Sequence, residues 1–252
     1  MYDKLVATQT FINGDYELAA DMFLEGAREG DAMASFNYAY CLWRALGRPY
    51  DPKSAKSYFS FARDLEGGAS NYNLAMLYLH GEGVPQNFEK AAQYMRFSAD
   101  QGCVEAQLYM GMACTLGAMF EPDVIGICLV PYHKPEYRDI NSFLIEGNIL
   151  DEEKEDKRYA VVAANEREAF YWFGRAARQN NHYVSDLIAK GKFLYAKCVI
   201  DGLGTEPSWD KGFRLMLSAG RNGSKEAVAY LKENGVTPAM ILAAARRDGD
   251  DK

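Results

Sequence analysis

Apolar residues recur at helical spacing along most of the chain, in pairs of segments joined by short polar turns. The clearest pair lies within residues 70–102. Its first half places Leu74 and Tyr78 four residues apart, on one face of a helix. Its second half does the same with Ala91 and Tyr94, three residues apart. The pattern predicts a helical hairpin, in which two amphipathic helices pack through these apolar faces.

The turn between the two halves is specified by residues 81–85, which read Gly-Glu-Gly-Val-Pro. Glycine tolerates the positive φ values that end a helix, and proline cannot continue one. Asn87 follows, and its side chain can cap the first free N–H groups of the next helix. We therefore expect a short and well-defined turn between the two helices.

The residue that opens the second helix of each pair recurs at a fixed spacing. Ala19, Ala55 and Ala91 lie 36 residues apart, and Ala169 and Gly212 take the corresponding places further along. A period of roughly 20–50 residues is typical of a solenoid, because one hairpin cannot bury its apolar face without a neighbour. The sequence therefore predicts an all-α, right-handed solenoid of about six antiparallel helix pairs, forming one domain over residues 1–252.

An insert separates the two helices of the fourth pair, and we place it at residues 118–165. It contains the apolar run of residues 124–132 and a charged cluster at residues 151–158, which is typical of a solvated helix face. A long apolar run is unfavourable in water. We predict that the insert folds back and narrows or caps the groove of the solenoid. A peripheral embellishment is the alternative. The last pair is expected to end in a helix within residues 237–250, and no strand is expected.

Composition and charge restrict the class of protein, its location and its ligands. The chain is 48% hydrophobic and 25% charged, which is typical of a globular protein. No run approaches the roughly 18 apolar residues of a membrane helix, and the N-terminal segment does not resemble a signal peptide, so we expect a cytoplasmic protein without membrane contact. A net charge of −7 argues against nucleic-acid binding, because such binding needs clustered Lys and Arg.

Motifs for catalysis or metal binding are not recognisable in the sequence. His80, His133 and His182 lie on different predicted elements, without an HExxH motif or paired cysteines. Nucleotide-binding and nucleophile-elbow motifs are also lacking. The five cysteines form no CxxC pair, so reduced thiols are expected. The sequence predicts no catalytic residue, no metal and no cofactor.

The unit at residues 70–102 resembles the Sel-1-like repeat, a branch of the tetratricopeptide superfamily. The residues that carry this resemblance are Leu74, Tyr78, Gly81, Gly83, Val84, Lys90, Ala91, Ala99 and Gly102. The other units keep fewer of these positions, and the resemblance covers nearly the whole chain apart from the insert. It implies a non-enzymatic protein-interaction module that acts as an adaptor, scaffold or regulator.

In that superfamily the first helix of each pair lines a concave groove. The same register in this chain places eleven candidate partner-binding residues in the groove: Phe36, Tyr40, Trp43, Arg44, Tyr72, Met76, His80, Leu108, Met112, Phe193 and Lys197. Aromatic and Met side chains offer a large and adaptable contact area, which suits a helical or extended peptide. The alternative is that several of these side chains pack within the core.

Two other functions remain open. The acidic charge would suit an antagonist or immunity-type protein for a basic toxin or enzyme. A secreted, cysteine-rich branch of the family is linked to penicillin binding and β-lactam hydrolysis, with paired cysteines in each hairpin. The cysteines of this chain are not paired in that way, which disfavours a hydrolase. The partner and the oligomeric state stay undetermined, with a monomer as one option.

Overall fold

The computed structural model describes residues 2–65, 67–120, 122, 124–128, 134–137 and 161–237. It divides into two compact units, each described below by itself. The first comprises residues 1–106 and 119–142, and the second comprises residues 107–118 and 143–252. None of the described helices is long and apolar enough to cross a membrane.

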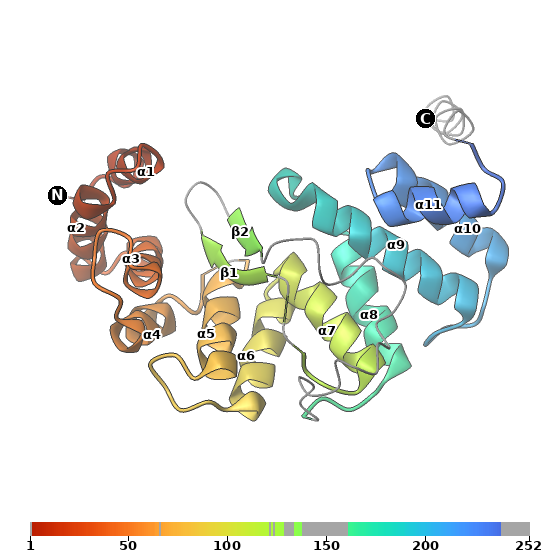
Figure 1. Ribbon diagram of the computed structural model, residues 1–252, viewed down its shortest axis with the longest axis horizontal. Coiled ribbons are helices and arrows are strands. Elements are labelled where there is room, and N and C mark those ends of the chain that lie inside the picture. Colours follow the sequence, from red (N-terminus) through yellow and green to blue (C-terminus); the bar gives the residue numbers. More distant parts are fainter. Residues whose placement is uncertain are drawn as a thin grey trace. The chain divides into compact units, whose positions relative to one another are not determined.

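Unit 1 is a stack of helices with a small strand pair. Its consecutive helices pack on one another, both within a pair and between pairs (Figure 1). They are α1 (Lys4–Ile12), α2 (Tyr16–Arg28), α3 (Ala32–Arg44), α4 (Pro52–Phe61), α5 (Ala69–His80) and α6 (Phe88–Asp100).

Unit 2 follows the same pattern, and α7 begins in unit 1 and continues into it. In unit 2, α9 packs on both α8 and α10, and α10 packs on α11. The elements are α7 (Val104–Leu116), α8 (Glu166–Ala177), the short helix η3 (His182–Val184), α9 (Ser185–Asp201), α10 (Trp209–Arg221) and α11 (Lys225–Glu233). The predicted class, helical repeats packed as a solenoid, is therefore confirmed.

Helix ends follow local capping and turn chemistry. Asp31 accepts the N–H of Ala34 at 2.6 Å, and Asn87 accepts that of Lys90 at 2.8 Å. The chain leaves α5 through Gly81 with a φ of 73°, in the left-handed region that favours glycine. The turn predicted between α5 and α6 is thus confirmed.

The residues that recur at the start of the second helices are packing positions. Ala19, Ala55 and Ala91 are fully buried. A Cβ added to Gly212 would lie 2.4 Å from Cγ1 of Ile200, so only glycine fits against α9 there. Small residues at these places let neighbouring helices approach closely, which explains the period.

A two-stranded antiparallel pair, β1 (Val124–Cys128) and β2 (Lys134–Tyr137), follows α7 in the sequence, and Ile127 lies opposite Pro135. The expectation that the chain has no strand is therefore wrong. The reason is that β1 carries three β-branched residues and obtains its hydrogen-bond partners from other parts of the chain, which helical periodicity cannot reveal.

The strand β1 packs against α5 (Figure 1). Ile127 is fully buried, and so is Met119 at the start of the same stretch. Folding back is thus confirmed for this part of the insert, and its role in narrowing or capping a groove stays a prediction. The charged cluster at residues 151–158 and nearly all of the last expected helix at residues 237–250 lie outside the described residues.

Candidate functional site

The predicted groove residues differ widely in exposure. Four of them are partly exposed, namely Arg44, His80, Phe193 and Lys197. The other seven are buried: Phe36, Tyr40, Trp43, Tyr72, Met76, Leu108 and Met112. The buried side chains contribute to packing in this conformation, as the alternative interpretation of the sequence foresaw for several of them. Partner contact by the set of eleven stays a prediction.

Trp43 connects α3 to the turn that follows α5. Its indole N–H donates a hydrogen bond to Oε2 of Glu82, and the Tyr50 hydroxyl donates to the same oxygen at 3.1 Å. The ring also contacts Phe59 edge to face, with 5.9 Å between ring centroids, and the Arg44 guanidinium lies 5.3 Å from its centroid. Trp43 therefore ties one hairpin to the next.

Phe193 and Lys197 lie on α9 in unit 2. Phe193 packs against the core formed by α9, α10 and α11. The Lys197 ammonium forms an ion pair with Asp201 at 2.9 Å and lies 5.3 Å from the ring centroid of Tyr230. These contacts hold both side chains against their own unit.

A reciprocal polar contact in unit 1 joins α5 to β1. The Asn73 side chain is fully buried, and its Nδ2 donates to the carbonyl oxygen of Ile127 at 2.9 Å. In return, the Ile127 N–H donates to Oδ1 of Asn73 at 2.8 Å. One carboxamide thus satisfies both backbone groups of one residue, as a neighbouring strand would in a β-ladder.

This pairing explains why β1 can lie with its outer edge, the edge away from β2, against the helix α5. The N–H and C=O of a strand residue point to the same side of the strand. Those of Ile127 point to Asn73, away from β2, where Pro135 has no N–H to offer. An unpaired strand edge is costly to bury, and Asn73 removes that cost at one residue.

Sequence reasoning missed Asn73, although a signal for it exists. Asparagine has a modest helix propensity and a polar side chain, so a central position in an apolar helix requires a reason. Asn73 holds such a position in α5, and Asn37 stands one repeat period earlier, at the centre of α3. A polar residue that repeats with the period of the fold was the available indication.

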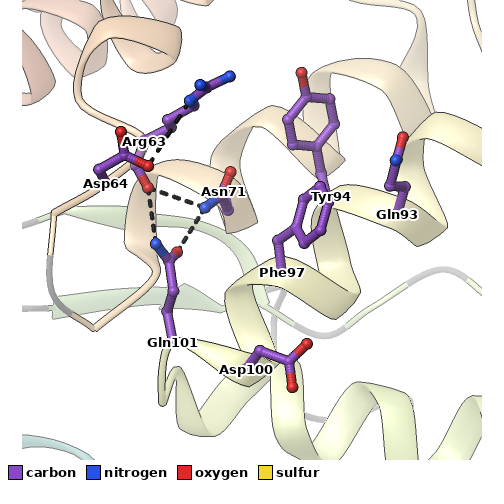
Figure 2. Close-up of a pocket in the computed structure, with 8 residues that line it drawn as sticks. All are labelled: Arg63, Asp64, Asn71, Gln93, Tyr94, Phe97, Asp100 and Gln101. Atoms are coloured by element: carbon purple, nitrogen blue, oxygen red, sulfur yellow. Dashed lines mark hydrogen bonds and ion pairs between the residues drawn. The ribbon is translucent and has the colours of Figure 1, made fainter.

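An open hollow of about 530 Å³ lies on unit 1, on the side of α6. Figure 2 shows that four of its polar residues, Arg63, Asp64, Asn71 and Gln101, interact with one another. The carbonyl oxygen of Arg63 accepts from Asn71 at 3.0 Å and from Gln101 at 3.1 Å, and these two side chains are themselves 2.5 Å apart. The ring of Phe97 contacts that of Tyr94 on the α6 side of the hollow.

The eight residues that line the hollow form no recognisable catalytic or metal-binding arrangement. Its lining combines Arg63 with the carboxylates of Asp64 and Asp100, three amide side chains and two aromatic rings. Burial raises the pKa of Tyr94, so its hydroxyl stays protonated at neutral pH. These eight residues include no nucleophile paired with a base, and no group of three metal ligands occurs within the described parts of the chain.

The four cysteines whose side chains are described are buried free thiols: Cys41, Cys103, Cys114 and Cys198. Burial, and next the charge of Glu105, holds the pKa of Cys103 well above its usual range, and the two side chains lie 3.1 Å apart. Burial, and next the charge of Asp201, raises the pKa of Cys198 to about 11. A thiol that stays protonated at neutral pH is a poor nucleophile.

A solved structure shares this fold, and a second one aligns more weakly. A Sel1 repeat protein from Oxalobacter formigenes aligns with a TM-score of 0.64 at 16% identity, over 92% of this chain and 75% of that one. A protective antigen of uropathogenic Escherichia coli with an SLR fold aligns with a TM-score of 0.44 at 15% identity, over 86% of this chain and 44% of its own. No curated protein sequence matches the chain.

Four segments of the chain match the Sel1 repeat, at residues 32–66, 68–103, 159–181 and 189–224. The first contains α3 and α4, and the second contains α5 and α6. Together the four segments cover more than half of the 252 residues. The fourth segment spans most of α9 and all of α10, and the third contains α8. Because the family model matches more than half of the chain, we conclude that this chain belongs to the Sel1 repeat family.

Proposed function

We propose that the protein is a non-enzymatic interaction module, an adaptor, scaffold or regulator, which holds an extended segment of a partner protein against the first helices of its repeats. The observation that carries the proposal is the seating of β1 on α5 through Asn73. Sel1 repeat proteins are in general protein-interaction modules, which supports the same class of function.

The contact between Asn73 and Ile127 supports recognition of an extended chain, since both of its hydrogen bonds are made to backbone atoms. Backbone pairing supplies affinity that does not depend on the sequence of the bound segment, and side-chain pockets add specificity. Tyr72 and Met76 flank Asn73 in α5 and are buried with it. A helix face of this kind can therefore take an apolar strand.

Three further assignments belong to the proposal. We treat residues 118–165 as an insert within one repeat domain, which supplies an internal strand for the binding face. We place the protein in the cytoplasm, where buried thiols such as those of Cys41 and Cys114 stay reduced. We assign it no reaction and no cofactor.

The test is a peptide selection on the immobilised full-length chain, with a library of unstructured peptides about 12 residues long. We expect enrichment of peptides with alternating aliphatic residues, typical of strands. A second arm uses Ile127→Pro, which removes the N–H that Asn73 accepts and so weakens the competing internal strand. Selected peptides should bind this variant more tightly than the wild type, whereas Ile127→Val, which keeps the N–H, should behave like the wild type.

The outcome that would contradict the proposal is equally clear. If neither the wild type nor Ile127→Pro enriches any peptide, and both remain folded by circular dichroism, binding of an extended segment is wrong. If peptides are enriched but Ile127→Pro binds them no better, the first-helix face of α5 is not where they bind.

A further inference from the structure

The second helices of two adjacent repeats, α4 and α6, carry a triplet that α2, α8 and α10 lack. It consists of a tyrosine, a phenylalanine and an aspartate at intervals of three residues, and its two copies are 36 residues apart. The copies are Tyr58, Phe61 and Asp64 at α4, and Tyr94, Phe97 and Asp100 at α6. Residues at this spacing follow one side of a helix, so we call each triplet an aromatic–acidic stripe.

The tyrosines of the two stripes have a packing role. The ring of Tyr58 contacts that of Tyr38 in α3 edge to face, with 4.9 Å between the centroids. The ring of Tyr94 stacks on that of Tyr78 in α5, with 5.5 Å between the centroids. Each tyrosine thus joins the second helix of its pair to the first. The fold therefore accounts for these two residues.

The phenylalanines have no such role to explain them. Phe61 is 58% exposed and Phe97 is 47% exposed. An exposed ring contributes little to stability, because it is not removed from water. The other second helices place a polar residue in the same register, namely Glu25, Arg175 and Ser218. Two exposed phenylalanines in adjacent repeats therefore indicate a surface that contacts something outside the chain.

The aspartates depart from the repeat in the same two helices. Asp64 lies just beyond the end of α4, and Asp100 is the last residue of α6. The C-terminal end of a helix carries a partial negative charge, which favours a cation and disfavours a carboxylate. The other second helices follow this preference and have arginine in the same register, namely Arg28, Arg178 and Arg221. The carboxylates at α4 and α6 are thus not what the helix ends favour.

The hollow on the side of α6 brings the two stripes together. At its base, Gln101 at the end of α6 donates to the carbonyl oxygen of Arg63, just beyond the end of α4, at 3.1 Å. Figure 2 shows the acidic end of α4 on one side of the hollow and the rings of α6 on the other. Four members of the two stripes line it, namely Asp64, Tyr94, Phe97 and Asp100.

Arg63 indicates which chemical group this hollow takes. Its guanidinium Nε lies 3.8 Å from Oδ1 of Asp64, and the two side chains are 61% and 87% exposed. Such an exposed contact is weak, so a guanidinium supplied from outside can replace it. A carboxylate also accepts more than one donor, and a guanidinium binds favourably over an aromatic ring. The lining therefore suits a cationic, planar side chain.

We propose that the two aromatic–acidic stripes form a second docking face, which binds a basic segment of a partner protein through its arginine side chains. An arginine enters the hollow, where its guanidinium pairs with Asp64 or Asp100 and its methylene stem packs on Phe97. Phe61 extends the apolar contact beyond the hollow. This face belongs to the second helices, so it goes beyond the function proposed for the first helices.

The charge of the chain supports a basic occupant. The net charge of −7 attracts a cationic partner and repels an acidic one. Arginine and aromatic residues are also the types that most often dominate the affinity of a protein interface. A second copy of this chain carries the same net negative charge, which disfavours it as the occupant.

The experiment titrates the 15N-labelled full chain with a synthetic peptide of sequence GLRGLRG, acetylated and amidated, and follows the backbone amide signals by NMR. A matched peptide has citrulline in place of both arginines, which keeps the length and the planar end of the side chain but removes the charge. We expect the citrulline peptide to bind at least tenfold more weakly. The largest shifts should occur near Phe61 and Phe97, and added salt should weaken binding of the arginine peptide.

Two charge variants locate the carboxylates. Asp64→Asn combined with Asp100→Asn should weaken binding of the arginine peptide about tenfold and remove most of its advantage over the citrulline peptide. Asp186→Asn combined with Glu206→Gln removes the same charge from exposed positions of unit 2 and should bind like the wild type. All four positions are exposed, so these variants should fold, and circular dichroism checks this. If the first variant does not fold, the shifts of the wild type decide.

A third variant tests the rings. Phe61→Ala combined with Phe97→Ala should weaken binding of both peptides, because the apolar contact does not depend on charge. It should leave the peptide-library selection described above unchanged, since that selection concerns the first helices. The two proposals can therefore fail independently.

Three results would overturn the inference. The first is a failure of the wild type to bind the arginine peptide, or equal binding of both peptides. The second is an equal loss of affinity in the two charge variants, which would mean that only the net charge attracts the peptide. The third is a dimer of the wild type in sedimentation velocity that the phenylalanine variant loses, which would assign this face to a second copy of the chain.

Discussion

Asn73 makes both hydrogen bonds of its buried carboxamide with the backbone of Ile127, 54 residues later in the chain, at 2.9 and 2.8 Å. A helix side chain here replaces a strand as the neighbour of β1. This contact ties residues 124–128 to the helical repeats of unit 1.

Replacement of Asn73 by Leu should therefore destabilise the protein, because the N–H and C=O of Ile127 would be buried without partners. We expect a loss of about 2 kcal/mol in the free energy of unfolding. Urea denaturation measures it, with Asn222→Ala as the control, since Asn222 is exposed and its side chain donates to the nearby carbonyl oxygen of Ser218 in α10. An equal midpoint for Asn73→Leu and the wild type would show that β1 does not depend on this contact.

Gly111 allows α7 to approach α8, since a Cβ at this position would lie 2.4 Å from Cε1 of Phe173. Phe173 is only 4% exposed and cannot move away freely. We expect Gly111→Ala to cost about 1–3 kcal/mol in unfolding free energy, measured by thermal denaturation. Adding Phe173→Leu should recover part of the loss, and strictly additive effects of the two changes would contradict the packing explanation.

Two features require glycine at position 83, namely its backbone conformation and the close approach of neighbouring atoms. It has a φ of +66°, and an added Cβ would lie 2.5 Å from the backbone nitrogen of Lys53. Gly14 has a φ of +87° and no atom within 4 Å of its Cβ position. Gly14→Ala should thus cost only about 1 kcal/mol, from the left-handed conformation, and Gly83→Ala clearly more. Equal losses in urea unfolding would show that the close contact is unimportant.

Cys198 should make the stability of the protein fall in alkaline solution. The pKa of its thiol is about 11 in the folded protein, against 9.0 without burial. The folded state therefore holds this proton more tightly, and the resulting stabilisation is complete below pH 9 and is lost as the pH rises towards 11. Its size is at most about 3 kcal/mol.

The comparison with Cys198→Ala isolates this contribution. The free energy of unfolding of both proteins is measured with urea, in the presence of reductant. The value for the wild type minus the value for the variant should decrease between pH 8 and pH 10.5. A difference that stays constant over this range would mean that Cys198 titrates alike in the folded and unfolded states.

The helical repeats could be predicted because their signals are local. Asn87 caps α6 through an N–H three residues away, and Gly81 ends α5 through its own backbone conformation. The alanines at positions 19, 55 and 91 record the packing of neighbouring helices with a constant period. Such signals lie within a few residues of the feature that they specify, so they can be read without the tertiary structure.

The candidate site was predicted less well, because burial depends on what packs from elsewhere. The register placed Tyr40 and Tyr72 on a groove, and both are buried. Helical periodicity identifies the face on which a side chain lies, but it cannot show whether another segment covers that face. Asn73 escaped notice for the same reason, since its partner is distant in the sequence.

By itself, therefore, the sequence determined the helix pairs, their turns, the repeat period and the family, all of which follow from short-range spacing and capping. Only the tertiary structure decided that residues 124–128 form a strand, that this strand lies on α5, and that Asn73 is the residue that pairs with it. The physical reason is that these features depend on hydrogen bonds between residues far apart in the chain, whose formation requires the fold to exist first.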